Sequence, residues 1–124
     1  MASLSTGSNE RALVFIGFMG AGKSKAALAA REAGLETVDA DWALERELGA
    51  PIDEFFAREG EAEFRRREEG LVIDLLERTA GGAIALGGGS VLSERVREAL
   101  RRHTIVWLEV DPETLVVLRV RLRR

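Results

Sequence analysis

A glycine-rich loop carries the strongest chemical signal in the sequence. Residues 17–24 read Gly-Phe-Met-Gly-Ala-Gly-Lys-Ser, and they lie between an apolar run at 12–16 and an alanine-rich stretch. Glycines let successive backbone N–H groups point at phosphate oxygens, and the helix that follows adds the positive end of its dipole. A purely structural turn would need neither Lys23 nor Ser24, so we expect this P-loop to bind the phosphates of ATP.

The polar residues around this loop fit a nucleotide with a magnesium ion. Lys23 would reach the β- and γ-phosphates, and the Ser24 hydroxyl would ligate Mg²⁺. Asp39, at the end of a second short strand, would hold the ion through water, because Mg²⁺ prefers oxygen ligands and keeps several waters. Its alternative role is the N-cap of a helix. The expected nucleotide contacts are Gly20, Ala21, Gly22, Lys23, Ser24 and Lys25.

Three further features suggest where the phosphate goes. Asp39 and Asp41 follow one strand, and the triple glycine at 87–89 follows another. Open α/β sheets bind ligands at such strand ends. Arg65 and Glu68 lie one helical turn apart, which by itself indicates a surface ion pair worth a few tenths of a kcal/mol.

Phe64 and the strand-end glycines favour a binding site over that surface pair. A guanidinium suits a substrate carboxylate, and a carboxylate suits its hydroxyls. Arg66 and Arg67 have no such support, and we expect them to be solvated.

The elements that must position these residues alternate between strand and helix. The patterns predict strands at 12–16, 36–39, 83–86 and 104–110, and helices at 24–33, 42–48, 51–58, 61–78 and 93–102, with Ser93 as an N-cap. Asp111-Pro112 would open a last helix. Such alternation indicates one three-layer α/β domain with a parallel sheet. We expect it to span residues 11–124, after a flexible tail at 1–10.

Composition excludes several classes of protein. The chain has a formal net charge of −3, no cysteine, and 46% hydrophobic residues. We therefore expect no nucleic-acid or membrane partner, no disulfide, and a cytoplasmic protein. His103, the single histidine, is expected at the surface or at a helix C-terminus, and Trp42 is expected to pack or to line the acceptor site.

In order and spacing, these motifs resemble the shikimate kinase family. That family carries G-x-x-G-x-G-K-S, D-x-D, I-x-E/D-x-F-x-x-x-G-E-x-x-F-R-x-x-E and L-G-G-G, which here lie at 17–24, 39–41, 52–68 and 86–89. The resemblance covers about residues 13–120. Its third and fourth motifs discriminate far better than the P-loop.

The resemblance implies a P-loop kinase fold with sheet order 2-3-1-4-5 and ATP-dependent phosphorylation of shikimate (EC 2.7.1) in aromatic amino-acid biosynthesis. Lys23 and Asp41 would be catalytic, with Asp41 orienting or deprotonating the attacking hydroxyl. Arg65 would bind the shikimate carboxylate, supported by Glu68. The backbone of Gly87, Gly88 and Gly89 would close the pocket.

The sequence departs from the family pattern in two places. Lys25 stands where the family usually has threonine. The family also continues through a lid with a phosphate-side arginine, a fifth strand and a C-terminal helix. We therefore expect a truncated chain that turns over poorly or not at all, because water-excluding closure is missing. Without a fifth strand, the apolar edge at 105–110 would promote self-association of an otherwise monomeric protein.

Other functions stay open at this point. One alternative is a non-catalytic nucleotide-binding fragment, or the N-terminal part of a larger fusion. Another is a different small-molecule P-loop kinase, such as a gluconate or nucleoside monophosphate kinase, although Arg65 with the triple glycine argues against both. A signalling GTPase is disfavoured, because the sequence has no N-K-x-D motif for guanine.

Overall fold

A computed structural model describes residues 11–17, 23–79, 81–109 and 117–121. The elements run in the order β1 (Leu13–Gly17), α1 (Lys23–Glu32), β2 (Thr37–Asp39), α2 (Ala40–Leu48), α3 (Ile52–Glu59), α4 (Glu61–Arg78), β3 (Ala83–Gly87), the 3₁₀ helix η1 (Gly88–Leu92), α5 (Glu94–Leu100), β4 (Thr104–Glu109) and β5 (Val117–Arg121). Within this described part, no helix is both long and apolar enough to cross a bilayer.

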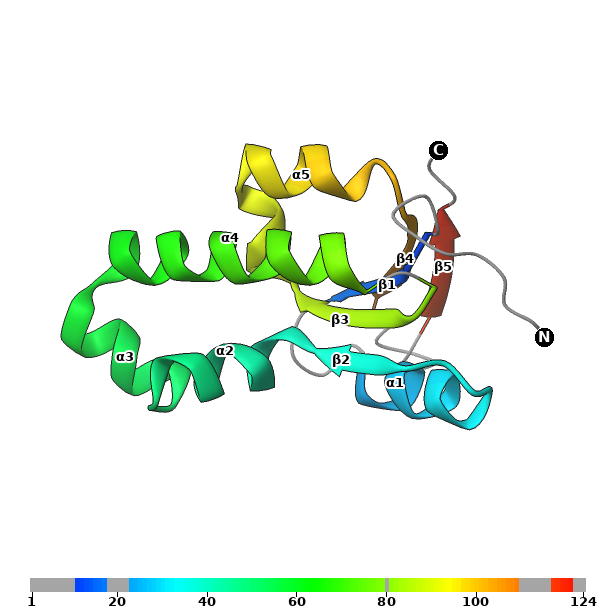
Figure 1. Ribbon diagram of the computed structural model, residues 1–124, viewed down its shortest axis with the longest axis horizontal. Coiled ribbons are helices and arrows are strands. Elements are labelled where there is room, and N and C mark those ends of the chain that lie inside the picture. Colours follow the sequence, from blue (N-terminus) through cyan, green and yellow to red (C-terminus); the bar gives the residue numbers. More distant parts are fainter. Residues whose placement is uncertain (1–10, 18–22, 80, 110–116, 122–124) are drawn as a thin grey trace.

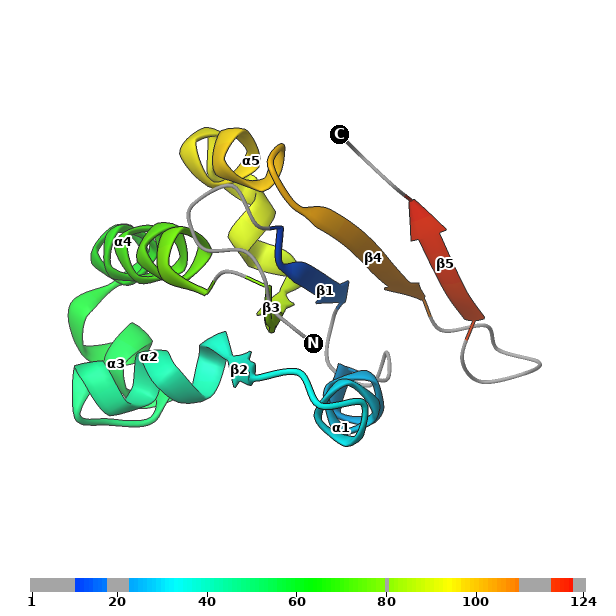
Figure 2. The same cartoon turned by 45° about the vertical axis from the view of Figure 1, so that its right-hand side comes forward.

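The strands form one sheet in the order β2-β3-β1-β4-β5. The first four strands of that order are parallel, and helices cover both faces of the sheet (Figure 1). Figure 2 shows α4 and α5 on one side of the sheet and α1 on the other. The predicted three-layer α/β fold with strand order 2-3-1-4 is therefore confirmed.

The core follows from the alternation of side chains along the strands. On β1, Val14 and Ile16 are fully buried in the cluster that also contains Leu71, Val72, Leu75 and Leu76 of α4. Phe15, between them, joins a second cluster with Ala30 of α1. A strand that is apolar at successive positions is thus buried on both faces, as parallel sheets require.

Most predicted elements are confirmed within two residues of their expected bounds. The long helix α4 spans the predicted residues 61–78, with Gly60 as its N-cap and Thr79 as its C-cap. Ser93 caps α5 as expected, with its Oγ accepting the N–H of Val96 at 3.1 Å. The 3₁₀ helix η1 directly after β3 was not among the predicted elements.

The prediction for the C-terminal part is wrong at residues 117–121, while Asp111 and Pro112, the expected start of the last helix, lie outside the described residues. Instead of an exposed edge followed by a helix, β5 pairs antiparallel with β4, from Ile105 opposite Arg121 to Glu109 opposite Val117. Residues 117–121 are rich in β-branched and apolar types, and pairing gives the β4 backbone hydrogen-bond partners. The edge expected to drive self-association is therefore covered, and an antiparallel strand holds the fifth position of the sheet.

The surface position expected for His103 is wrong, although the residue does follow the C-terminal end of α5. This side chain is buried, and its Nδ1 accepts a hydrogen bond from the N–H of Ala12 at 2.9 Å. Burial, together with the nearby charges of Arg102 and Arg11, lowers the pKa of His103, although a hydrogen bond with the Leu76 backbone opposes the shift. His103 is thus a neutral link between the starts of β1 and β4.

Candidate active site

Parallel strands bring the predicted site residues to one edge of the sheet. β1, β2 and β3 end at Gly17, Asp39 and Gly87, with Gly17 opposite Gly87 in the register. The start of the P-loop, the Asp39–Asp41 pair and the triple glycine therefore meet at the carboxyl ends of the strands, as expected.

The nucleotide contacts are only partly within the described structure. Gly20, Ala21 and Gly22 lie outside the described residues, and so does the side chain of Ser24. Lys23 is the first residue of α1, and Lys25 is exposed.

Lys23, Asp41 and Gly87 form the first group of site residues. The Nζ atom of Lys23 lies 3.9 Å from Oδ2 of Asp41. A Cβ atom at Gly87 would lie 3.6 and 3.7 Å from the two carboxylate oxygens of Asp41 and 3.9 Å from Nζ. The end of β3 thus borders both the cation and the carboxylate.

The environment of Asp41 makes its carboxylate more basic. Burial is the main cause that raises the pKa of Asp41, and repulsion by Asp39 and Glu45 adds to it, while Lys23 lowers the pKa. A carboxylate with a raised pKa accepts a proton more readily.

Asp39 caps the helix that carries Asp41. Its Oδ1 accepts the backbone N–H of Asp41 at 2.9 Å and that of Trp42 at 3.2 Å. The alternative role considered for Asp39 is therefore present in the structure. Among the described residues, these hydrogen bonds occupy Oδ1 and leave Oδ2 without a donor.

Arg65, Glu68 and Gly89 form the second group. Nη1 of Arg65 donates to Oε1 of Glu68 at 2.8 Å, so the expected support is present. A Cβ atom at Gly89 would lie only 2.6 Å from Nη1, because the guanidinium packs directly on this glycine. These residues line a cavity of about 370 Å³ that Ser90 also borders.

The sequence did not indicate two residues that contact the partners of Arg65. Ser90 is buried and donates through Oγ to Oε2 of Glu68 at 3.3 Å. Phe56 is partly exposed and packs at 5.4 Å between ring centroids on Phe64, whose ring also lies under the Arg65 guanidinium. In the sequence, Ser90 stood out only as a serine directly after the triple glycine, and Phe56 only as an aromatic residue next to Phe55.

The expectation of solvated side chains holds for Arg66 and not for Arg67. Arg66 is exposed and pairs with Glu63, although it also borders the cavity of Arg65. Arg67 is half-buried, because its guanidinium lies over the Phe55 ring and 3.9 Å from Glu47.

The two groups are close enough to contact one small molecule. Gly87 borders Asp41, Gly89 borders Arg65, and the Cα atoms of two residues spaced i, i+2 are at most about 7 Å apart. A ligand with hydroxyls at one end and a carboxylate at the other fits this spacing of charges.

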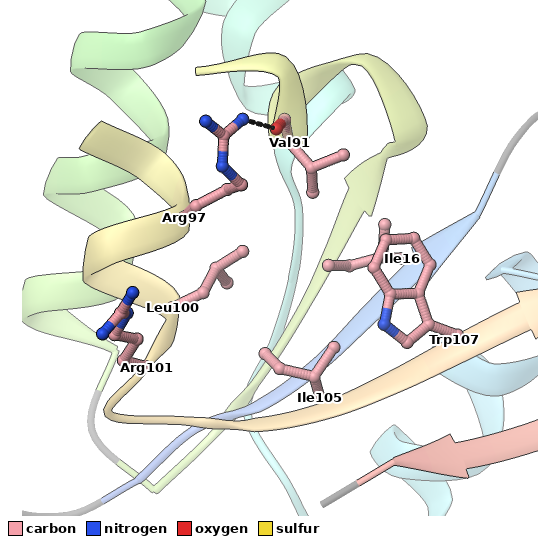
Figure 3. Close-up of a pocket in the computed structure, with 7 residues that line it drawn as sticks. All are labelled: Ile16, Val91, Arg97, Leu100, Arg101, Ile105 and Trp107. Atoms are coloured by element: carbon pink, nitrogen blue, oxygen red, sulfur yellow. Dashed lines mark hydrogen bonds between the residues drawn. The ribbon is translucent and has the colours of Figure 1, made fainter. Parts of the chain in front are cut away.

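A separate cavity lies away from this site. It measures about 290 Å³ and lies between α5, η1 and the strands β1 and β4 (Figure 3). Its walls include Ile16, Leu100 and Trp107, with Arg97 donating to the Val91 carbonyl at its rim. It contains none of the predicted site residues. Trp42 is exposed elsewhere, under the guanidinium of Arg46.

Comparison with known proteins agrees with this geometry. The family model described as shikimate kinase matches residues 19–124. The chain belongs to the shikimate kinase family. The matched residues make up most of the chain, and they include Asp41, Arg65 and the triple glycine.

Relatives and solved structures of the family give the same result. A shikimate kinase from Rhodococcus erythropolis is 46% identical over 99 residues, which are 79% of this chain and 58% of the relative. The structure of the Acinetobacter baumannii shikimate kinase in complex with shikimate aligns with a TM-score of 0.77 and 35% identity, over 86% of this chain and 60% of that one. The Bacteroides thetaiotaomicron shikimate kinase aligns with a TM-score of 0.74 and 31% identity, over 82% and 59%. The chain thus spans less than two thirds of the length of these relatives.

Proposed function

We propose that this chain carries out, or contributes to, ATP-dependent phosphorylation of a shikimate hydroxyl. One observation carries the proposal: a carboxylate beside a lysine borders Gly87, and a guanidinium lies on Gly89, at the end of the same strand. Family membership and the solved complex of a relative with shikimate support the same acceptor.

Arg65 would bind the carboxylate of shikimate. Glu68 takes a hydrogen bond from Nη1, which leaves Nη2 of the same guanidinium for a ligand. The backbone of Gly88 and Gly89 would close this end of the pocket, because glycine offers N–H groups without a side chain in the way.

Asp41 would act on the attacking hydroxyl. The hydroxyl oxygen attacks the γ-phosphorus of ATP, the bond from that phosphorus to the bridging oxygen breaks, and ADP leaves. The hydroxyl proton passes to the Asp41 carboxylate, whose raised pKa suits an acceptor. Lys23, 3.9 Å from Asp41, would face the transferred phosphoryl group.

The residues on the nucleotide side fit a magnesium ion bound mainly through phosphates and water. The described residues contain no cluster of three histidine or acidic side chains that could hold a metal alone. Mg²⁺ needs only one or two protein oxygens beside substrate phosphates, and Oδ2 of Asp39 has no hydrogen-bond donor in the described part. We propose that Ser24 and Asp39 hold the ion, which would neutralise charge on the phosphates, and that Gly20, Ala21, Gly22 and Lys25 contact the nucleotide.

An ADP-release assay tests this proposal. Shikimate and a panel of sugar acids are offered with ATP and Mg²⁺, to the unaltered chain and to Arg65→Ala, Asp41→Asn and Arg78→Ala. We expect release that depends on shikimate, lost in the first two variants and kept in Arg78→Ala, since Arg78 forms an exposed pair with Asp74 and does not line the cavity of Arg65.

Other outcomes would contradict the proposal in different ways. A signal with another acceptor alone would show that the acceptor assignment is wrong. ATP binding by calorimetry without ADP release for any acceptor would instead support a non-catalytic nucleotide-binding fragment.

A further inference from the structure

Two adjacent glutamates of α4 reach across to the segment that follows the triple glycine. Oε2 of Glu68 accepts from Ser90 at 3.3 Å, and Oε2 of Glu69 accepts from Ser93 at 2.6 Å. The two contacts have the same chemistry, but only Glu68 also holds Arg65.

The Glu68 carboxylate depends on its donors because it is buried. Glu68 is 7% exposed and Ser90 is 3% exposed. Oε1 accepts from Arg65 and Oε2 from Ser90, so each oxygen has one donor among the described residues. A buried carboxylate oxygen without a donor is costly, and the terminal torsion of glutamate rotates easily. Loss of the Ser90 hydroxyl would therefore let the carboxylate turn away from Arg65.

The Arg65 guanidinium has few other polar restraints. Its Nε is buried without a hydrogen-bond partner in the described part of the chain, and Oε2 of Glu61 lies 3.8 Å away. Gly89 and the Phe64 ring limit the position of the guanidinium without fixing its rotation. The Glu68 contact is thus the bond that sets its direction.

We infer that Ser90 is a positioning residue for the acceptor site. It fixes the Glu68 carboxylate, which in turn aims the Arg65 guanidinium into the cavity of about 370 Å³. The effect on shikimate rests on the proposed function, whereas the effect on Arg65 itself does not. Ser90 borders the same cavity, and its effect on Arg65 passes through Glu68.

Ser93 provides a matched control. Ser93→Ala removes the same kind of hydroxyl from the neighbouring glutamate, and it also removes the N-cap of α5. It should therefore lower the melting temperature at least as much as Ser90→Ala. If the Arg65 signal or the shikimate affinity changes in Ser90→Ala and stays the same in Ser93→Ala, the change cannot come from a loss of stability alone.

The test combines a side-chain NMR signal with ligand titration on the full chain. The Nε–H resonance of Arg65, assigned by its absence in Arg65→Lys, is recorded without ligand for the unaltered chain, Ser90→Ala and Ser93→Ala. We expect Ser90→Ala to shift or broaden this signal and Ser93→Ala to leave it unchanged. In calorimetric titrations, Ser90→Ala should raise the Kd for shikimate about threefold to tenfold, which corresponds to the loss of one ordinary hydrogen bond.

A double variant isolates the route through Glu68. In the Glu68→Ala background, which lacks any side-chain acceptor at this position, adding Ser90→Ala should change neither the Arg65 signal nor the affinity any further. An unchanged Arg65 signal in Ser90→Ala would overturn the inference. Failure of the unaltered chain to bind shikimate would count against the proposed function, and the Arg65 signal would still decide the role of Ser90.

Discussion

The guanidinium of Arg65 lies so close to Gly89 that a Cβ atom at residue 89 would come within 2.6 Å of Nη1 and 3.1 Å of Nη2. Glycine is therefore the residue that leaves space for Arg65 at this position. The atoms that a methyl group would displace are the end of a flexible side chain, so the conflict affects the site more than the fold.

Gly89→Ala should weaken shikimate binding with little effect on stability. We expect a rise in Kd of about tenfold, since the guanidinium must leave both Gly89 and its Glu68 contact. Calorimetry and thermal melts measure the two effects. Gly70→Ala is the control, because its Cβ would meet no atom within 4 Å, and it should stabilise α4 by up to about 1 kcal/mol. If Gly89→Ala and Gly70→Ala bound shikimate with equal affinity, the close packing of Arg65 on Gly89 would be refuted.

Gly82→Ala should destabilise the fold without acting on the site. A Cβ atom there would lie 2.5 Å from the carbonyl oxygen of Glu36, which accepts the N–H of Ala83 at 2.8 Å. This backbone cannot move without breaking the hydrogen bond, so we expect a loss of about 1–3 kcal/mol in the free energy of unfolding. Urea denaturation measures it, and a value equal to the unaltered chain would contradict the contact.

Acid should weaken the fold through His103. The lowered pKa means that the folded state favours neutral His103. The stabilisation of the fold by neutral His103 is therefore fully present above pH 6.5, and it is lost as the pH falls through the pKa of His103 in the folded state. Protonation of Nδ1 removes the acceptor for Ala12, a loss of about 1 kcal/mol. Urea denaturation at pH 7.5 and 5.5 measures this difference. His103→Gln should flatten it, because the chain has one histidine; an unchanged pH dependence in that variant would argue against the assignment.

Asp41→Asn should make the ligand-free chain slightly more stable while removing phosphotransfer. The raised pKa means that the ionised carboxylate opposes folding: its stabilising contribution is present below pH 3.8 and is lost as pH rises through the folded value. Because the side chain is half exposed, we expect a gain below about 1 kcal/mol at pH 7.

Thermal melts at pH 7 and pH 3.5 measure this effect, and the gain should shrink at the lower pH. A loss of stability at pH 7 would mean that attraction to Lys23 outweighs the effect of burial.

The sequence by itself determined the features that local patterns specify. The P-loop motif, the bounds of α4, the Ser93 cap and the two-sided burial of β1 depend on residues that are near each other along the chain. The spacing of the Asp-x-Asp, Phe-Arg-x-x-Glu and triple-glycine motifs likewise indicated the family before any fold was known.

Only the tertiary structure decided the contacts between distant segments. Ser90 reaches Glu68 across 22 residues, and His103 reaches Ala12 across 91, so no local pattern reveals either hydrogen bond. Residues 117–121 are compatible with several structures alone, and pairing with the open backbone of β4 makes them a strand. Local sequence thus specifies which elements form, whereas burial and hydrogen bonding in the assembled fold determine which polar groups face one another.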